Sequence, residues 1–202
     1  MRSGEGKPAV RLVAGLGNPG REYAFTRHNA GFWFLDALAS KVGAAFRSES
    51  KFQGQLGKAE GNLRLLKPMT YMNLSGRCVS AAARFFTIAP AEILVVHDEL
   101  DLLPGDAKMK FGGGVAGHNG LKDISAQLGT KDFWRLRIGI GHPRDSSIPQ
   151  QDVADYVLAP PALSDGKVIT EALDRALDAW PAIEGGEFER AMLLLHTKEK
   201  KP

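Results

Sequence analysis

The sequence predicts an α/β protein: a single domain built on a mixed, partly parallel, twisted β-sheet that helices flank on both faces. Two observations support this fold class. Short aliphatic runs that are typical of strands alternate along the chain with longer segments whose apolar residues recur at helical spacing. One of these runs, residues 92–96, is almost continuously apolar, as expected for a strand that is buried on both faces of a layered sheet.

The elements are predicted in an interleaved order. Strands are expected at residues 10–14, 52–61, 62–67, 92–96, 107–111 and 135–140, and helices at residues 29–42, 74–88, 120–128, 168–180 and 188–196. Gly61 and Asn62 have the composition of a hairpin turn, so the strands on either side of them are expected to pair antiparallel. From about residue 153 onward the chain is predicted to be mostly helical.

The chain is predicted to form one domain. Its 202 residues contain no internal repeat, low-complexity tract or long linker. We therefore expect a domain over residues 10–197, preceded by a flexible leader at residues 1–9 and followed by a flexible tail at residues 198–202. Hydrophobic residues make up 44% of the chain and charged residues 24%, which excludes a disordered or fibrous protein.

Several features bear on where the protein works. Cys78 is the only cysteine, which excludes an internal disulfide framework and suits a reducing compartment. No apolar run approaches the roughly 18 residues of a membrane span, and the first residues lack the apolar stretch of a secretory signal. We therefore predict a cytoplasmic protein without a membrane partner.

The charge of the chain is unevenly distributed. Residues 1–150 carry 20 Lys and Arg against 13 Asp and Glu, whereas residues 151–190 carry 3 against 9. A basic body with an acidic helical end could attract a polyanion to one face only. An uneven but merely solvated surface explains the same numbers, so charge alone leaves both interpretations open.

A glycine-rich loop follows the first predicted strand. Residues 15–20, with the sequence GLGNPG, match the G-x-G-x-x-G pattern of dinucleotide-binding proteins. In those proteins a helix begins inside the motif, and an acidic residue follows about 20 residues later. Here the next helix is expected only from Asn29, and no such acidic residue ends a second strand. A nucleotide-dependent oxidoreductase therefore stays open as a weakly supported alternative.

His28 and Asp98 are the predicted catalytic residues. His28 lies just before the helix that is expected from residue 29, and Asp98 follows the buried strand. A carboxylate that binds one imidazole nitrogen fixes the tautomer and leaves the other nitrogen as a base facing the substrate. The chain has no G-x-S-x-G motif, and Cys78 falls inside a predicted helix, so no serine or cysteine nucleophile is indicated. We therefore expect His28 to activate water.

Residues 97–101, with the sequence HDELD, resemble a metal site. Carboxylates bind hard divalent cations, but neighbouring residues of a strand point to opposite faces of the sheet. The sequence also lacks H-E-x-x-H and paired cysteines, which would support a zinc site. We therefore expect no metal, and Glu99 and Asp101 fit the turn that leads to Pro104.

Asparagines on three loops, one of them the loop that carries His28, complete the candidate site. Asn18, Asn73 and Asn119 carry amides that can position water or stabilise an oxyanion without titrating, although asparagine also commonly caps helices. Lys108 and Lys110 precede a glycine-rich loop and could bind a nucleic-acid backbone. The same lysines could instead protect a strand edge, or serve an RNA-binding protein that has no catalytic activity.

Together these motifs resemble the bacterial peptidyl-tRNA hydrolases. The blocks that carry the resemblance occur in the family's order and with compatible spacing over roughly residues 10–195. They are GLGNPG at 15–20, TRHNAG at 26–31, KPMTYMNLSG at 67–76, HDELD at 97–101, GGG at 112–114, HNGLK at 118–122 and RIGIGHP at 137–143. One departure is Tyr71, which stands where the family more often has phenylalanine.

The resemblance implies a monomeric α/β hydrolase without metal or other cofactor. It would cleave the ester between the peptide and the 3′ ribose of tRNA, and so return free tRNA to translation after ribosome rescue. Its partner would be the acceptor end and 3′ CCA of peptidyl-tRNA.

The resemblance also implies roles for individual residues. His28 would be the general base and Asp98 its orienting partner. Asn18 and Asn73 would position water and the substrate peptide, Asn119 would hold the water or the carbonyl, and Tyr23 and Met72 would line the site. We add Tyr71, which lies in the matching block at 67–76, and, from the residues themselves, Lys108 and Lys110 to the expected substrate and tRNA-binding residues.

Overall fold

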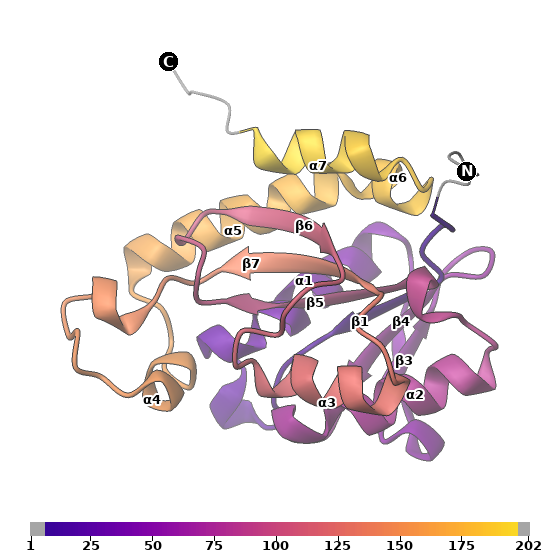
Figure 1. Cartoon of the computed structure of the whole chain (residues 1–202), viewed down its shortest axis with the longest axis horizontal. Helices are drawn as coiled ribbons and strands as arrows, with labels where there is room; N and C mark the ends of the chain where they lie inside the picture. Colours follow the sequence, from indigo (N-terminus) through magenta and orange to yellow (C-terminus); the bar gives the residue numbers. More distant parts are fainter. Residues whose placement is uncertain (1–6, 198–202) are drawn as a thin grey trace.

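The computed structural model describes residues 7–197 and is a single layered α/β body (Figure 1). Most of the predicted leader, residues 1–6, and the whole predicted tail, residues 198–202, lie outside the described part of the chain. Residues 7–9 are exposed and belong to no helix or strand. The helices of the described part include none that is both long and apolar enough to span a membrane.

A mixed sheet of seven strands forms the middle layer, as the sequence predicts. Its strands lie in the order β2-β3-β4-β1-β5-β7-β6. Four central strands run parallel, and antiparallel pairs stand at both margins: β2 with β3, β3 with β4, and β6 with β7. The strands are β1 (Leu12–Gly15), β2 (Phe46–Glu49), β3 (Gly54–Lys58), β4 (Arg64–Pro68), β5 (Ile93–Glu99), β6 (Ala107–Phe111) and β7 (Trp134–Gly139).

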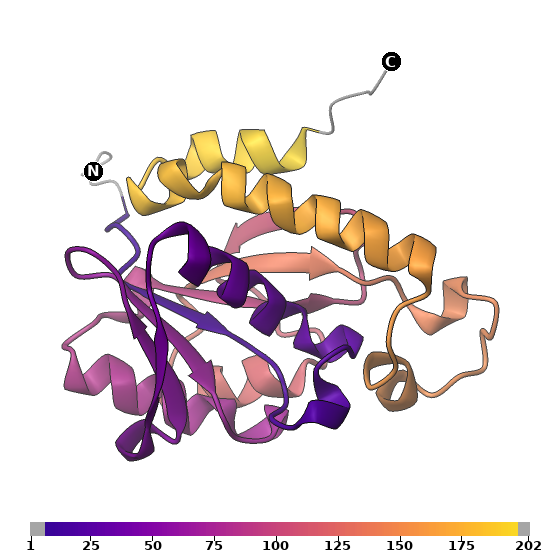
Figure 2. The ribbon, with the colours of Figure 1, turned by 180° about the vertical axis from the view of Figure 1, so that it is seen from behind.

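Helices cover both faces of this sheet. On one face lie α2 (Ser75–Phe85) and α3 (Asn119–Leu128), and on the other lie α1 (Ala30–Lys41), α5 (Leu163–Asp178), α6 (Trp180–Glu184) and α7 (Phe188–His196). Figure 2 shows α1 and α5 crossing the second face. The short helix α4 (Val153–Val157) stands beyond the carboxyl ends of β5 and β7 (Figure 1).

Each face of the sheet has its own hydrophobic core. Alternate residues of the central strands point to opposite sides, so Leu94 and Val96 join the core under α1 and α5, whereas Ile93 and Val95 join the core under α2 and α3. The apolar run at residues 92–96 is therefore buried on both faces, which confirms the interpretation drawn from the sequence.

Several element boundaries differ from the sequence prediction. Strand β2 has no predicted counterpart, because its residues are polar or half-exposed and show no alternation of buried apolar side chains. The strand expected to end at residue 96 continues to Glu99. Helix α5 begins at Leu163 rather than at residue 168 and ends at Asp178, just before Pro181. The hairpin turn at residues 61–62 is confirmed, with β3 and β4 antiparallel on either side of it.

Close packing at the start of α1 positions the loop that carries His28. Gly31, in the first turn of α1, lies against the ends of β1 and β5, where a Cβ would overlap the backbone nitrogen of Leu16 and the carbonyl oxygen of Val96. Because glycine has no side chain, the helix can approach the two strands directly. The 3-10 helix η2 (Arg27–Asn29), which precedes α1, is thereby held at the edge of the sheet.

Candidate active site

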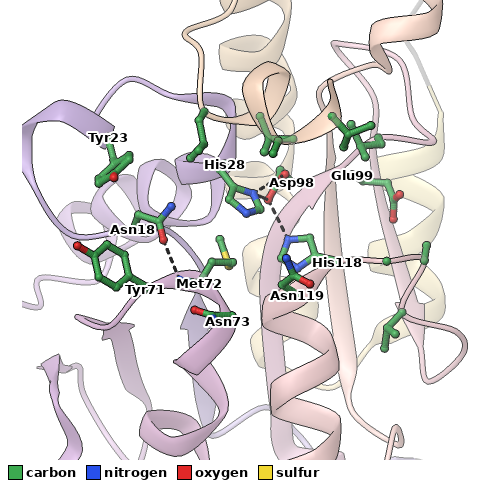
Figure 3. Close-up of a pocket in the computed structure, with 18 of the residues that line it drawn as sticks. Asn18, Tyr23, His28, Tyr71, Met72, Asn73, Asp98, Glu99, His118 and Asn119 are labelled. Atoms are coloured by element: carbon green, nitrogen blue, oxygen red, sulfur yellow. Dashed lines mark hydrogen bonds and ion pairs between the residues drawn. The ribbon is translucent and has the colours of Figure 1, made fainter. Parts of the chain in front are cut away.

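A cavity of about 750 Å³ opens at the carboxyl ends of the central strands (Figure 3). This is the edge at which open α/β sheets bind their ligands. The loops after β1, β4 and β6, the end of β5 and helix α4 contribute its walls. The cavity brings together most of the residues that the sequence predicted for the site, namely Asn18, Tyr23, His28, Tyr71, Met72, Asn73, Asp98 and Asn119.

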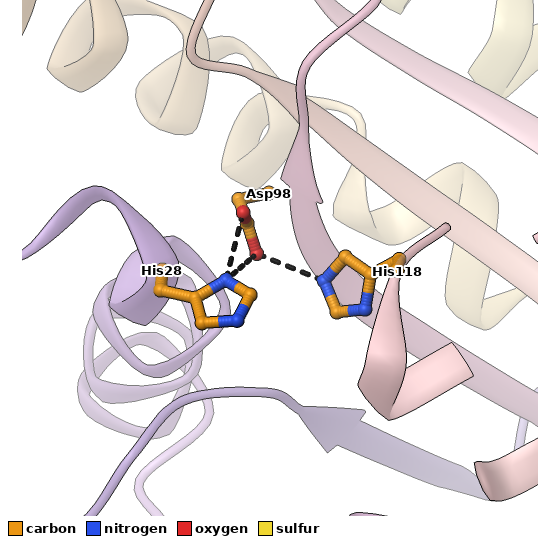
Figure 4. A group of neighbouring side chains, drawn as sticks. All are labelled: His28, Asp98 and His118. Atoms are coloured by element: carbon orange, nitrogen blue, oxygen red, sulfur yellow. Dashed lines mark hydrogen bonds and ion pairs between the residues drawn. The ribbon is translucent and has the colours of Figure 1, made fainter. Parts of the chain in front are cut away.

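His28 and Asp98 form a direct pair, as the sequence predicts. The Nδ1 atom of His28 lies 3.0 Å from Oδ1 and 2.9 Å from Oδ2 of Asp98 (Figure 4). Only 2% of the Asp98 side chain is exposed, compared with 13% for His28. With Nδ1–H donated to the carboxylate, the neutral imidazole carries its lone pair on Nε2. The arrangement is that of a histidine base with an orienting carboxylate.

His118 is a second partner of Asp98. Its Nε2 lies 2.9 Å from Oδ1 of Asp98, and its Nδ1 accepts a hydrogen bond from the backbone N–H of Leu121 at 3.3 Å. Because Nδ1 is an acceptor, Nε2 carries the hydrogen that is donated to Asp98. A neutral His118 therefore satisfies both bonds while it caps α3, and it has no free nitrogen to act as a base.

The charges in this cluster set two pKa values in opposite directions. Burial disfavours the imidazolium form of His28, but the charge of Asp98 and its hydrogen bond outweigh this, so the pKa of His28 is raised above its ordinary value. Burial alone would raise the pKa of the Asp98 carboxyl. Its two imidazole partners instead hold that pKa well below its usual range. Asp98 therefore stays ionised wherever His28 titrates.

His97 lies beneath this cluster and is fully buried. Its Nδ1 donates to the backbone oxygen of Asp98 at 2.7 Å, and its ring centroid lies 5.0 Å from that of His118. Burial, together with the nearby His118, lowers the pKa of His97 to about 3. The ring is therefore neutral, so it supports the backbone of Asp98 without contributing charge.

Asn18 is held in one orientation by the loop around it. Its Oδ1 accepts a hydrogen bond from the backbone N–H of Met72 at 2.8 Å (Figure 3). Its backbone is bound on both sides by the buried side chain of Asn29, which accepts from its N–H and donates to its carbonyl. Since the amide oxygen of Asn18 is occupied, its Nδ2 donor is the group left to face the cavity.

The other asparagines lie at the mouth of the cavity on different elements. Asn73 belongs to the 3-10 helix η4 (Met72–Leu74), and Asn119 is the first residue of α3; both side chains are exposed. Tyr23 and Tyr71 flank the same side of the cavity as Asn18 (Figure 3), and the buried Met72 lies between these groups. These exposed amides therefore lie beside the half-buried His28 and are open to the cavity.

The two predicted lysines lie apart from this cavity. Lys108 and Lys110 are exposed on the edge strand β6, opposite Arg137 and Arg135 of β7 in the strand pairing. Neither lysine lines the cavity. They belong to a basic strip of four residues on one face of the sheet margin, so any contact they make with a substrate is outside the cavity itself.

Three functional positions were not predicted from the sequence. His118 was seen only as part of a loop before a helix, although its place next to Asn119 could have suggested it. Arg135 is buried and donates to the carbonyls of Gly113 and Gly114 at 2.7 and 2.6 Å. These bonds fix the glycine-rich loop that follows β6, beside the cavity. Glu99 lines the cavity and accepts from Nε of Arg137 at 2.9 Å.

Within residues 7–197, one group of residues could hold a metal ion. His28, Asp98 and His118 each offer a ligand atom, and these atoms lie within 4.8 Å of one another. Two imidazoles and one carboxylate are a donor set that zinc-class cations accept. Each imidazole also has the Asp98 carboxylate at hydrogen-bonding distance, at 2.9 Å for both.

The comparisons with known proteins agree with this geometry. The family model described as peptidyl-tRNA hydrolase matches residues 12–202. The chain is 55% identical to a peptidyl-tRNA hydrolase of Azoarcus sp. strain BH72, covering 93% of this chain and 85% of that protein. It is 57% identical to one of Aromatoleum aromaticum, covering 94% and 95%.

Solved structures agree as well. The crystal structure of peptidyl-tRNA hydrolase from Acinetobacter baumannii is 43% identical and covers 96% of this chain and 97% of its own, with a TM-score of 0.88. Matching sequence, fold and length over nearly the whole chain shows that this protein belongs to the peptidyl-tRNA hydrolase family, a family of hydrolases.

Proposed function

We propose that this protein hydrolyses the ester bond that joins a peptide to the 3′ ribose of tRNA, with His28 as the general base. The observation that carries the proposal is the buried His28–Asp98 pair, in which Nδ1 faces the carboxylate at 2.9 Å and the other ring nitrogen is left for the cavity. Membership of a family whose members are named for peptidyl-tRNA hydrolysis supports the choice of substrate.

In the proposed mechanism, Nε2 of His28 removes a proton from water as the water oxygen attacks the ester carbonyl. Asp98 stabilises the imidazolium that forms and does not itself take the proton. The tetrahedral intermediate then expels the 3′ oxygen of the ribose, which receives the proton from His28. The products are a peptide carboxylic acid, which releases its proton to solvent as the carboxylate forms, and a tRNA with a 3′ hydroxyl, so atoms and charges balance.

Asparagine side chains would supply the donors that this reaction needs. Asn18 presents its Nδ2 group to the cavity because its oxygen accepts from Met72, and we assign it to the substrate carbonyl or the attacking water. Asn73 and Asn119 would hold the peptide and the water from the other two elements. Preorganised amide donors are worth about 10²–10³ in kcat when they stabilise an oxyanion.

The RNA part of the substrate would lie along the exposed surface. Tyr23 and Tyr71, at the mouth of the cavity, would contact the 3′ CCA end, and Lys108 and Lys110 would contact backbone phosphates of the acceptor end. The reaction would return tRNA to translation after ribosome rescue. We expect the protein to act as a cytoplasmic monomer without a cofactor.

The test is hydrolysis of N-acetyl-aminoacyl-tRNA, measured alongside free aminoacyl-tRNA and a His28→Ala variant. We expect cleavage of the acetylated substrate and a loss of about 10²–10⁴-fold in kcat for the variant, with an unchanged circular dichroism spectrum. Absence of cleavage by the folded wild-type protein would contradict the proposal and favour an RNA-binding protein without catalytic activity.

A further inference from the structure

A buried cation next to His28 has no place in the mechanism above. Arg27 belongs to η2, only 8% of the residue is exposed, and it does not line the cavity. Its Nη1 donates to the backbone oxygens of Tyr156 and Ala159 at 3.1 and 3.2 Å. The guanidinium carbon lies 4.0 Å from the centroid of the Tyr156 ring. The partners of this cation are thus carbonyl oxygens and an aromatic face.

These contacts all fall on the segment around α4, which forms one wall of the cavity. Val153, Ala154, Val157 and Leu158 line the cavity from this side, and Figure 1 shows α4 standing outside the layered body. A helix of five residues is not stable through its own backbone hydrogen bonds, because these bonds contribute less free energy than helix nucleation costs. The position of this wall therefore depends on its contacts with the rest of the protein.

Arg27 provides contacts that connect the α4 segment to the rest of the protein. Its side chain binds the carbonyl of Tyr156, in the last turn of α4, and that of Ala159, just beyond the helix. The Tyr156 carbonyl also accepts from the N–H of Ala159 at 3.3 Å, so Arg27 ties together the end of the helix and the chain that follows it. The backbone N–H of Arg27 also donates to Ala159 at 3.1 Å. On the far side, the hydroxyl of Tyr156 donates to the backbone oxygen of Ile140 at 2.7 Å. The segment is thus held between η2 and the chain that leaves β7.

We propose that Arg27 is a positioning residue that fixes the α4 wall relative to His28, the residue that follows it. This role rests on the proposed function, and it adds that Arg27 sets the width of the cavity beside His28. We call Arg27 and Tyr156 the strap, because the carbonyl and aromatic contacts between them together hold the α4 wall in place. In this proposal the α4 wall touches the substrate when it is bound. Loss of the strap therefore weakens substrate binding, while the His28–Asp98 pair stays intact.

The experiment uses Arg27→Met and Tyr156→Leu in the full-length chain. For each we expect kcat/KM for N-acetyl-aminoacyl-tRNA to fall about 10- to 100-fold through a higher KM, because small misplacements of a site cost this much. The acid midpoint of the kcat profile should not move. Amide hydrogen exchange at residues 152–159 should speed up at least about tenfold, while exchange in the sheet is unchanged.

Three further variants sharpen the test. Arg27→Lys keeps the charge but lacks the plane that stacks on Tyr156, so it should recover only part of the loss. The double variant Arg27→Met/Tyr156→Leu should be little worse than either single variant, because both remove the same strap. Arg84→Met, on the exposed side of α2, is the matched control and should leave kinetics and exchange as in the wild type.

Three results would overturn the proposal: kcat/KM within about twofold of wild type, slower catalysis without faster exchange at residues 152–159, or additive effects in the double variant. If Arg27→Met does not fold, Arg27→Lys and Tyr156→Leu carry the same comparison. Hydrogen exchange requires no substrate. If the wild-type protein hydrolyses nothing, the proposed function fails, while the exchange data still decide whether Arg27 holds the α4 wall.

Discussion

At the scale of single residues, two histidines that are bound to the carboxylate of Asp98 have different hydrogen-bonding roles. His118 uses both ring nitrogens, one for Leu121 and one for Asp98, whereas His28 uses only Nδ1. The difference comes from the backbone. His118 caps a helix and so receives an N–H donor, while η2 presents no donor to the second nitrogen of His28. The sequence contains both histidines, but this division of roles follows from their neighbours.

With His28 as the proposed general base, the pH dependence of activity should follow the titration of this residue. A general base must be neutral, and Asp98 raises the pKa of His28 above its ordinary value of about 6.5. We therefore expect kcat/KM to rise with pH through a midpoint above 6.5. In Asp98→Asn the midpoint should move to lower pH and kcat should fall about 10²–10⁴-fold, because charge and orientation are both lost. A midpoint unchanged in Asp98→Asn would contradict this coupling.

Asn18 offers a sharper test of its donor role. In Asn18→Asp one carboxylate oxygen can still accept from the N–H of Met72, but the second oxygen replaces the Nδ2 donor that faces the cavity. We expect a loss of about 10²–10³-fold in kcat with little change in melting temperature. Asn62→Asp, in the exposed hairpin turn, adds the same charge and should retain full activity. Equal losses in both variants would point to a general charge effect.

At the scale of elements, the approach of α1 to the sheet depends on a missing side chain. In Gly31→Ala the new methyl group would overlap backbone atoms of Leu16 and Val96, which cannot rotate away. We expect a loss of about 1–3 kcal/mol in the free energy of unfolding, or roughly 5 °C in melting temperature for a chain of this size. Activity should fall as well, because η2 and His28 move with α1.

The control for this prediction is Gly43→Ala, just after α1. A Cβ at Gly43 meets nothing within 4 Å, but its backbone is left-handed with φ of 67°. The cost there is local backbone strain, so stability falls while activity at neutral pH should stay close to that of the wild type. Loss of activity in Gly43→Ala to the same extent as in Gly31→Ala would argue against a specific packing requirement.

The element boundaries show which helices and strands can be predicted from the sequence pattern and which cannot. The strands β5, β6 and β7 and the helices α1, α3 and α7 were predicted within a few residues, because their apolar residues repeat with the period of the element. Strand β2 was missed since it lies at the sheet margin and buries little. The prediction that β5 ends at Val96 was wrong, because polar residues there looked like a loop although the strand continues to Glu99.

At the scale of the whole molecule, burial of neutral histidine makes stability depend on pH. The pKa of His97 is lowered to about 3 by burial and by His118, whereas in the unfolded chain it is about 6.5. Between these values the unfolded state binds a proton that the folded state does not, so stability falls as pH drops below about 6.5. The expected loss from pH 7 to pH 5 is roughly 2 kcal/mol for this residue.

Urea denaturation at pH 7 and pH 5 measures this effect. His97→Gln cannot titrate, so its stability should change less between the two pH values than that of the wild type. His28 has the opposite sign: its raised pKa contributes stability below about 6.5 that is lost as pH rises through its folded value, so it offsets part of the His97 loss at pH 5. Both proteins contain His28, so this offset cancels when their pH dependences are compared. An identical pH dependence in both proteins would contradict the assignment to His97.

The sequence by itself determined the α/β class, the mixed sheet, the order of most elements and the family to which the chain belongs. It also indicated eight of the residues that line the cavity. His28, Asp98 and the three asparagines followed from the rule that polar residues after strands in such folds meet at one edge, whereas Tyr23, Tyr71 and Met72 came with the family resemblance. These properties depend on local periodicity and short motifs, which are readable along the chain.

Only the tertiary structure decided how those residues interact. The bond of His118 to Asp98 spans 20 residues, and the contact of Arg27 with Tyr156 spans 129. No local pattern encodes such pairs, since they depend on how strands align and how closely helices approach the sheet. The neutral state of His97 and the remoteness of Lys108 and Lys110 from the cavity have the same origin. Burial and distance are properties of the packed molecule, and they set the chemistry of side chains whose identity the chain already contained.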